Sequence, residues 1–270
     1  MIHPTAIVDA DAALGANVSI GPYAIVGPNI TLGDDVEIAG HAMLEGRVVL
    51  GARVRVGPGA VIGGEPQDLK FTRATPSGVR IGAGTVIREY VTIHRATTRD
   101  GWTEIGEDCL LMGLCHVAHD CRLGDGVVVI NYAGITGHCE IGDRATIGGL
   151  VGVVPFTRVG TFAYVGGCAK VNQDVPPFMI ADGNLATVRG VNVVGLRRAG
   201  VGPSERRALR EAHRLLYRSG LAPAAALERM HRELEPTRQV KELIAFVESA
   251  KRGILGPRDP DDDAETEGED

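Results

Sequence analysis

The chain has 270 residues, a formal net charge of −6 and 37 glycines, and only 4% of its residues are aromatic. No apolar stretch approaches the ~18 residues that a membrane span requires, so we expect no stable membrane insertion. The scarcity of aromatic rings disfavours nucleic acid as a partner, because single-stranded bases stack on such rings. Met1 to Pro4 show no basic region followed by an apolar core, so we expect no signal peptide and a cytoplasmic location.

An aliphatic residue occupies every sixth position in three long runs. The runs are Val8, Leu14, Ile20, Val26, Leu32, Ile38, Leu44, Leu50, Val56 and Ile62; Ile81, Ile87 and Ile93; and Ile105, Leu111, Val117, Leu123, Val129, Ile135, Ile141, Ile147, Val153, Val159, Val165 and Val171. A period of six fits neither an α-helix nor a coiled coil. It is typical of a parallel β-helix, in which three hexads form one triangular coil. We therefore predict a mainly β fold, a left-handed parallel β-helix of hexapeptide repeats over residues 1–185.

The residue two places before each aliphatic position points the same way, because side chains alternate along a strand. Four of the five cysteines occupy such inward positions: Cys109, Cys115, Cys121 and Cys139. We expect small buried thiols there. The alternative is a metal site or a disulfide between Cys121 and Cys139, which lie one coil apart.

Two segments interrupt the period, residues 65–78 and residues 96–103. Insertions in repeat proteins form surface loops, often on a binding face. The first segment contains Asp68 and Lys70, a charged pair that favours a binding role over passive decoration.

The repeat ends at Asp174-Val175-Pro176-Pro177, and apolar stripes predict three helices in a C-terminal α-helical domain over residues 186–256, the first helix capped by Ser204. Residues 197–252 contain 13 basic and 7 acidic side chains. This excess predicts an acidic protein partner or a phosphorylated substrate. Residues 257–270 contain eight acidic residues and one arginine, so we expect an acidic disordered tail.

Four histidines fall in the central coils: His94, His116, His119 and His138. His116 lies between two inward-facing residues and therefore points outward. His119 and His138 fall at corners of adjacent coils, so we expect them within about 5–8 Å of one another.

Two chemistries fit such a cluster. Three imidazoles can hold zinc, as in the trimeric hexapeptide carbonic anhydrases. Alternatively, one histidine acts as a general base while the others bind substrate. The charged loop and the cationic helices favour the general base. A purely structural β-helix remains a third interpretation.

Four motifs resemble those of the acyl-[acyl-carrier-protein]–UDP-N-acetylglucosamine O-acyltransferases, which begin lipid A synthesis. They are IREYVTIHRAT (87–97), LMGLCHVAHDC (111–121), VGGCAKVNQDVPPFMIADGN (165–184) and LLYRSG (215–220). The resemblance extends from His3 to Gly256. It implies a homotrimer with active sites between adjacent prisms, acyl carrier protein as donor, UDP-N-acetylglucosamine as acceptor, and neither a metal nor another cofactor.

The resemblance also implies residue roles. His119 matches the catalytic base, with Asp120 beside it, and Gly137 matches the residue whose backbone N–H stabilises the oxyanion. The positions that match substrate-binding residues are Asp68, Lys70, His94, His116, His138, Gly167, Asn192 and Arg198, of which Gly167 limits the acyl-chain length. The implied reaction transfers a (3R)-hydroxyacyl group directly to the 3-hydroxyl of the sugar, because no serine or cysteine nucleophile is evident by motif.

The chain departs from the family pattern at two places. Val154-Pro155 stand where His-Gln is common, and Leu185 stands where histidine is usual. Each change removes a polar contact near the substrates. We therefore expect these changes to affect the affinity for the nucleotide and the identity of the acceptor sugar.

Overall fold

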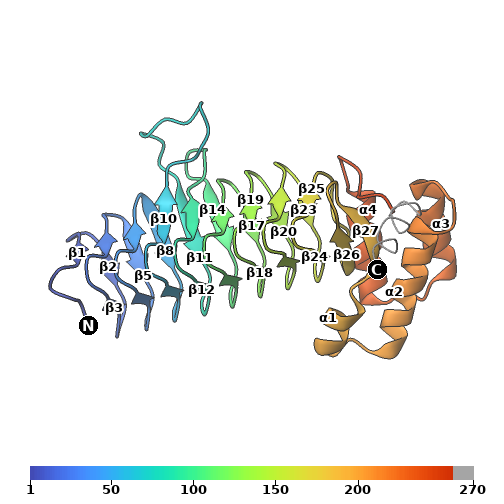
Figure 1. Ribbon diagram of the computed structural model, residues 1–270, viewed down its shortest axis with the longest axis horizontal. Coiled ribbons are helices and arrows are strands. Elements are labelled where there is room, and N and C mark those ends of the chain that lie inside the picture. Colours follow the sequence, from blue (N-terminus) through green and yellow to red (C-terminus); the bar gives the residue numbers. More distant parts are fainter. Residues whose placement is uncertain (258–270) are drawn as a thin grey trace, which may run out of the picture.

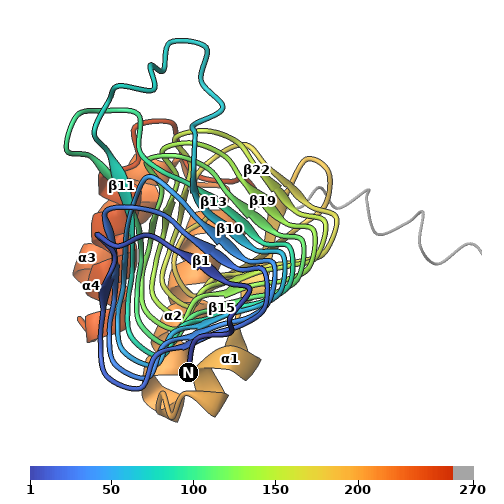
Figure 2. The same cartoon turned by 90° about the vertical axis from the view of Figure 1, so that its left-hand side faces the viewer.

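The computed structural model describes residues 1–257; the predicted acidic tail, apart from Pro257, lies outside the described residues. The molecule is an elongated prism with a group of helices at its C-terminal end (Figure 1). Seen along the prism, the coils stack as triangles (Figure 2). Three sheets form the three faces, and their strands are parallel except for the last strand of one sheet, which confirms the predicted left-handed parallel β-helix.

We number the sheets in the order in which the chain enters them. Sheet 1 contains β1 (Ile7–Val8), β4 (Ile25–Val26), β7 (Met43–Leu44), β10 (Val61–Gly64), β13 (Thr92–His94), β16 (His116–Val117), β19 (Gly134–Ile135), β22 (Gly152–Val153) and β25 (Lys170–Val171). Sheet 2 contains β2 (Ala13–Leu14), β5 (Ile30–Leu32), β8 (Arg47–Leu50), β11 (Gly78–Ile81), β14 (Trp102–Ile105), β17 (Arg122–Leu123), β20 (Glu140–Ile141) and β23 (Arg158–Val159). Sheet 3 contains β3 (Ser19–Ile20), β6 (Glu37–Ile38), β9 (Arg55–Val56), β12 (Val86–Ile87), β15 (Leu110–Leu111), β18 (Val128–Val129), β21 (Thr146–Ile147), β24 (Tyr164–Val165), β26 (Met179–Asp182) and β27 (Thr187–Val191).

The hexapeptide period determines what lies inside the prism. From Val18 to Val171, the residues at both inward positions of each hexad are buried. Only the first coil differs, where Leu14 is still 37% exposed. Cys121 and Cys139 are buried free thiols, as expected, and form no disulfide. The narrow interior thus accepts mainly aliphatic and thiol side chains, with three buried threonines, Thr85, Thr103 and Thr157, as its polar members.

Residues one coil apart lie above one another. His116 pairs in register with Gly134, and Gly134 pairs with Gly152. At the corners the chain adopts positive φ, as at Asp120 (59°) and His138 (62°). Aspartate and histidine are among the non-glycine residues that tolerate this conformation. The corners can therefore present acidic and imidazole side chains at regular intervals.

Both interruptions of the period leave the prism at the same corner. Residues 65–77 connect β10 to β11, and residues 95–101 connect β13 to β14, so each joins sheet 1 to sheet 2. We call this corner the 1–2 edge. The first loop projects furthest from the prism (Figure 1). The insertions are surface loops, as predicted.

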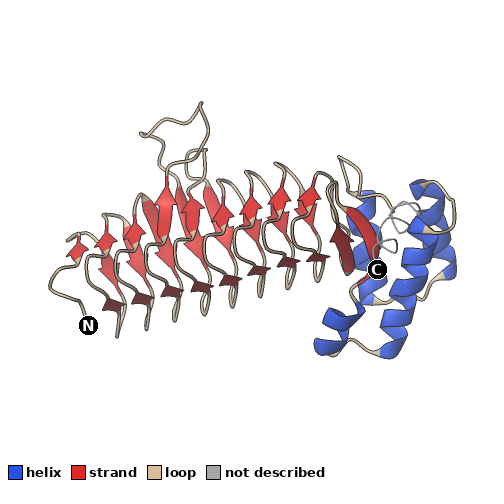
Figure 3. Ribbon diagram, in the orientation of Figure 1, coloured by secondary structure: helices blue, strands red, loops and turns tan. Residues whose placement is uncertain are grey.

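The last strands of sheet 3, β26 and β27, lie next to the C-terminal helices (Figure 3). β26 continues sheet 3 in parallel to β24, whereas β27 runs antiparallel to β26. The helices are α1 (Val193–Arg198), α2 (Pro203–Tyr217), α3 (Pro223–Glu233) and α4 (Arg238–Glu248). The three predicted helices are present, and α1 is an additional short helix. The prediction that Ser204 caps the first long helix is wrong, because Pro203 takes the first helical position and Gly202 is the N-cap.

A buried ion pair joins the helices to the prism. Arg158 on β23 donates from Nε to Oδ2 of Asp174 at 2.8 Å, and the Asp174 side chain is 3% exposed. The same guanidinium donates to the carbonyl oxygen of Phe246 on α4. The residues that end the repeat therefore also anchor the C-terminal helices. Within residues 1–257, no helix is long and apolar enough to span a bilayer.

Candidate active site

His119 and Asp120 form the centre of a polar cluster on the 1–2 edge. Nδ1 of His119 lies 2.8 Å from Oδ2 of Asp120, and each side chain is only 13% exposed. An ionised carboxylate accepts hydrogen bonds, so Nδ1 carries the hydrogen and Nε2 presents its lone pair. This tautomer gives His119 a basic nitrogen directed away from its acidic partner.

The second interruption loop holds Asp120 in place. Thr97 donates to the carboxylate from its backbone N–H at 3.1 Å and from its hydroxyl at 2.8 Å. The hydroxyl of Thr103 accepts from the Asp120 backbone N–H at 2.9 Å. These contacts fix the carboxylate of Asp120, which in turn orients the ring of His119. The sequence analysis missed both threonines. Thr97 lies on a loop, which offers no period from which contacts can be predicted, and Thr103 takes an inward position of β14, where the period predicts burial but no particular hydrogen bond.

His138 lies beside this pair, as the repeat predicts. Its ring centroid is 5.2 Å from that of His119, within the expected range. Its Nε2 is 3.7 Å from Oδ2 of Asp120. On its other side, the ring of Phe156 stacks almost parallel at 4.6 Å. His138 is thus fixed between an acidic group and an aromatic face, with 37% of its side chain exposed.

Gly137 lies directly beneath the imidazole of His119. A Cβ atom at this position would be 2.5 Å from Cε1 of His119. The backbone N–H of Gly137 has no hydrogen-bond acceptor among residues 1–257. The glycine therefore makes room for the ring and leaves an N–H available beside it.

His94 and His116 make a second imidazole pair on the outer face of sheet 1. Their ring centroids are 4.7 Å apart, and Nδ1 of His116 lies 2.7 Å from the hydroxyl oxygen of Thr92. Burial, together with the positive charges of His116, His119 and Arg95, lowers the pKa of His94 to about 4. Burial also lowers the pKa of His116. Both rings are therefore neutral at pH 7 and available for hydrogen bonding.

Asp68 and Lys70 lie on the first interruption loop, and the structure does not bring them into contact with the histidines. The Lys70 backbone N–H donates to Oδ1 of Asp68 at 2.8 Å. The base of the loop is held by Arg95, which donates to the carbonyl oxygen of Gly63 at 3.0 Å. Its guanidinium also lies 5.2 Å from the ring centroid of Phe71. Arg95 follows His94 directly and links the loop to the histidine cluster, a connection that the sequence analysis missed.

The other expected substrate-binding residues lie elsewhere on the chain. Gly167 is at the corner between sheets 3 and 1, and Arg198 is exposed at the end of α1. Asn192 caps α1, because its side-chain oxygen accepts from the Gly195 N–H at 3.0 Å. Its amide donates to the carbonyl oxygen of Phe162 at 2.9 Å. Within one chain, these residues do not join the histidine cluster.

His119, Asp120 and His138 each offer a potential metal-ligand atom, and these atoms lie within 4.8 Å of one another. The Asp120 carboxylate, however, already accepts hydrogen bonds from Thr97 and His119. A metal ion would have to displace these contacts. The donor set therefore fits a hydrogen-bonded acid–base pair better than a metal centre.

Two family models match the chain. Residues 174–255 match the model described as Udp N-acetylglucosamine O-acyltransferase; Domain 2. Residues 11–46, 29–64 and 103–137 match Bacterial transferase hexapeptide (six repeats). The fold and these two matches thus define an acyltransferase of the hexapeptide-repeat class.

Similarity to complete proteins narrows this class. The acyl-[acyl-carrier-protein]–UDP-N-acetylglucosamine O-acyltransferase of Paraburkholderia xenovorans is 46% identical over 260 residues, which are 94% of this chain and 98% of that protein. The enzyme of the same name from Thermodesulfovibrio yellowstonii is 41% identical over 254 residues, with the same coverage of each chain. The solved structure of UDP-N-acetylglucosamine acyltransferase from Bacteroides fragilis superposes with a TM-score of 0.92 at 35% identity, covering 94% of this chain and all of that one. The chain belongs to the acyl-[acyl-carrier-protein]–UDP-N-acetylglucosamine O-acyltransferase family. This membership decides among the three functions that the sequence left open, in favour of an acyltransferase.

Proposed function

We propose that the protein transfers a (3R)-hydroxyacyl chain from acyl carrier protein to the 3-hydroxyl of UDP-N-acetylglucosamine, the first step of lipid A synthesis. The observation that carries this proposal is the His119–Asp120 pair, with Nδ1 bonded to the carboxylate at 2.8 Å. Family membership supplies the reaction class. A cytoplasmic location belongs to the same proposal and rests on the family resemblance.

His119 acts as the general base. Its Nε2 removes the proton from the sugar hydroxyl as that oxygen attacks the thioester carbonyl. The carbon–sulfur bond then breaks, and His119 returns the proton to the departing thiolate. Asp120 stabilises the imidazolium that forms between these two steps. The transfer is direct. Four of the five cysteines are buried inside the prism, and the exposed one, Cys168, lies on the corner between sheets 3 and 1, not beside His119.

The Gly137 amide stabilises the oxyanion. In a tetrahedral intermediate, negative charge develops on the former carbonyl oxygen, and a preoriented N–H beside the base lowers its free energy. The Gly137 N–H has no acceptor among residues 1–257 and lies under the His119 ring. Its availability at this place supports the role.

The active site is completed by a second copy of the chain in a homotrimer. Asp68 and Lys70 extend from the 1–2 edge, whereas Gly167 lies on a different corner and Arg198 lies at the helical end. A single prism keeps these groups apart. In a homotrimer, a cleft between adjacent prisms would bring together the loop, the histidines and the helices of different copies. The separation of these groups in one chain is what supports the trimer and the substrate-binding roles of these residues, including Asn192.

Acyl carrier protein docks on the cationic C-terminal helices. Residues 197–252 carry 13 basic and 7 acidic side chains, and Arg206, Arg207 and Arg210 lie together at the start of α2. Complementary charge steers an acidic partner to such a surface. The thioester arm would then reach the neighbouring cleft from the helical end of the prism.

One assay tests the reaction. The purified protein is incubated with UDP-N-acetylglucosamine and a panel of hydroxyacyl carrier proteins, and the nucleotide products are measured by mass spectrometry. We expect one hydroxyacyl group to be added to the sugar nucleotide, with no loss of rate after chelation of metals. A folded protein that yields no acylated product with any donor would refute the reaction. A zinc-restored activity would refute the mechanism.

A further inference from the structure

A cavity lies in the C-terminal domain, away from the histidine cluster. Its volume is about 820 Å³, and it is formed by β27, α2 and the end of α3. Small-molecule sites commonly have volumes of this order. Five arginines line it: Arg189, Arg207, Arg210, Arg214 and Arg218. This density of guanidinium groups sets the cavity apart from the other surfaces of the prism.

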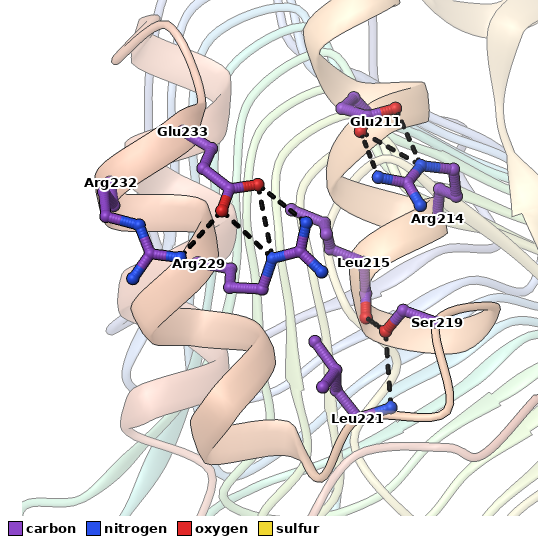
Figure 4. Close-up of polar contacts among 8 residues, drawn as sticks. All are labelled: Glu211, Arg214, Leu215, Ser219, Leu221, Arg229, Arg232 and Glu233. Atoms are coloured by element: carbon purple, nitrogen blue, oxygen red, sulfur yellow. Dashed lines mark hydrogen bonds and ion pairs between the residues drawn. The ribbon is translucent and has the colours of Figure 1, made fainter.

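The acidic residues around the cavity are largely engaged by other partners. Glu211 accepts from Nε of Arg214 with both oxygens at 3.0 Å, and Glu233 lies 2.9 Å from Arg229 Nη2 (Figure 4). Arg232 forms a further ion pair with Glu233. Glu235 is the remaining acid of the lining. Most of the local negative charge is therefore already neutralised.

The remaining four arginines keep their charge available. Arg189, Arg207, Arg210 and Arg218 form no ion pair within residues 1–257. Nη1 of Arg189 is buried and has no hydrogen-bond partner in this part of the chain. Arg189 lines the cavity, so its positive charge acts on an anion bound there, although Nη1 itself is closed to solvent.

His213 adds a neutral donor to this lining. It lies on α2 and is buried. Burial lowers the pKa of its imidazole, and the positive charge of Arg218 lowers it further. A neutral imidazole can hydrogen-bond a ligand without adding to the repulsion among the arginines.

We propose that this cavity binds a multivalent oxyanion, such as a phosphate or diphosphate group, at a site separate from the acyltransferase centre. Guanidinium groups bind such oxygens in bidentate pairs, which gives both strength and orientation. Four uncompensated arginines match the charge of a diphosphate. This site goes beyond the proposed acyl transfer, because none of its lining belongs to the histidine cluster. It shares Arg207 and Arg210 with the proposed docking surface for acyl carrier protein, whereas Arg189 and Arg218 line the cavity and were not assigned to that surface.

Two sources can supply the oxyanion. One is a free phosphorylated molecule. The other is the chain's own acidic segment, residues 259–270, which lies outside the described residues and contains eight carboxylates. The described chain ends at Pro257, and Gly256 accepts a hydrogen bond from the Val188 N–H at 2.9 Å. Val188 immediately precedes Arg189, so the described part of the chain ends beside the cavity.

The test is calorimetric titration of inorganic diphosphate into the full-length protein at low ionic strength. Two full-length forms are compared: the wild type, and a form in which the eight acidic residues of 259–270 are replaced by the corresponding amides. We expect one diphosphate per chain in at least one of these forms. Binding to both identifies a free anion as ligand, and binding only to the amide form identifies the chain's own carboxylates as occupant. Failure to bind in both forms would overturn the proposal.

Variants localise the binding. Arg189→Met should weaken diphosphate binding by about tenfold or more, because it removes one of the four positive charges in the lining that form no ion pair. Arg206→Gln is the matched control, since this neighbouring arginine does not line the cavity, and it should change affinity less than about twofold. Arg198→Gln tests the proposed nucleotide site instead. If Arg198→Gln abolishes diphosphate binding and Arg189→Met does not, the cavity is not the binding site. In either case, Arg189→Met should leave the rate of acyl transfer unchanged.

Discussion

The imidazole of His119 rests on the α-carbon of Gly137, one coil further along the prism, so closely that a methyl group there would be 2.5 Å from Cε1. The two residues are separated by one full coil, and the stacking of coils brings them together. The position of the base is therefore set by the absence of a side chain on its neighbour. A substitution at the glycine moves the ring, not only the backbone beneath it.

Gly137→Ala should lower kcat by about 10²-fold, because a displacement of about 1 Å is enough to misalign a general base. The KM for the sugar nucleotide should change much less, since the ring is displaced but the other contacts remain. Gly152→Ala is the control, because a Cβ there meets no atom within 4 Å. Steady-state kinetics of both variants decide the matter. Equal kcat values for the two variants would show that the position of the His119 ring does not depend on Gly137.

His119→Ala should lower kcat by ~10²–10⁴, the usual contribution of general base catalysis. The proposed trimer and the binding of UDP-N-acetylglucosamine should persist, as measured by light scattering and calorimetry. His41→Ala provides a control outside the cluster, because His41 stacks on Tyr23 at 5.2 Å on another corner. Turnover near that of the wild type in His119→Ala would exclude His119 as the base.

His94 should make the protein less stable as the pH falls. Its pKa is lowered from 6.5 to about 4 in the folded state, mainly by burial. Between these two values the unfolded chain binds the proton and the folded chain does not, so the free energy of unfolding decreases from pH 6.5 toward pH 4. Urea unfolding at several pH values measures this. His94→Gln should show a shallower dependence than the wild type, and identical slopes would contradict the prediction.

Replacing Arg206, Arg207 and Arg210 by glutamate should raise the KM for acyl carrier protein and leave the KM for the sugar nucleotide nearly unchanged. For the wild type, the carrier KM should also increase with salt, because exposed charges are screened over about 10 Å at 0.1 M ionic strength. Initial rates at several salt concentrations provide the measurement. A carrier KM that is independent of salt would argue against electrostatic docking.

Gly167 should set the preferred length of the acyl chain. His119 and Gly167 are separated by two to three coils, which is about 10–15 Å along the prism. With no side chain to close the groove there, the enzyme should prefer hydroxyacyl chains of about fourteen carbons over those of ten. Gly167→Met should reverse the order, because each methylene denied burial loses ~0.8 kcal/mol. Competition between donors of different length measures the profile, and an unchanged profile would show that another residue ends the groove.

The period of six accounts for most of what could be predicted about the fold. It identified the buried positions because an inward side chain recurs at fixed spacing. It also placed His119 beside His138, whose rings are 5.2 Å apart. The same period places Phe156 one coil beyond His138. Phe156 could not be identified as a site residue, because the side chain of phenylalanine has no catalytic or ligand-binding group that would single it out.

Contacts made outside the period could not be predicted. The hydrogen bonds from Thr97 to Asp120 and the anchoring of the first loop by Arg95 depend on the path of irregular segments. Asn192 is a different case. Its role as cap of α1 follows a known preference for asparagine at helix starts, but six residues are too few to show a helical stripe. The proposed contacts between chains could not be predicted from the period either, because the period describes only the packing within one chain.

The reversal of β27 has a consequence for self-association. A stack of near-identical coils is a template, because the last parallel strand offers the same row of N–H and C=O groups as every strand before it. Here β27 runs antiparallel to β26, and its other edge is bridged by Pro257 at Val188. The C-terminal segments of the chain therefore cover the hydrogen-bonding edge at the end of sheet 3. Another prism cannot add there as one more coil, so a repeat that in principle grows without limit ends in a molecule of fixed length.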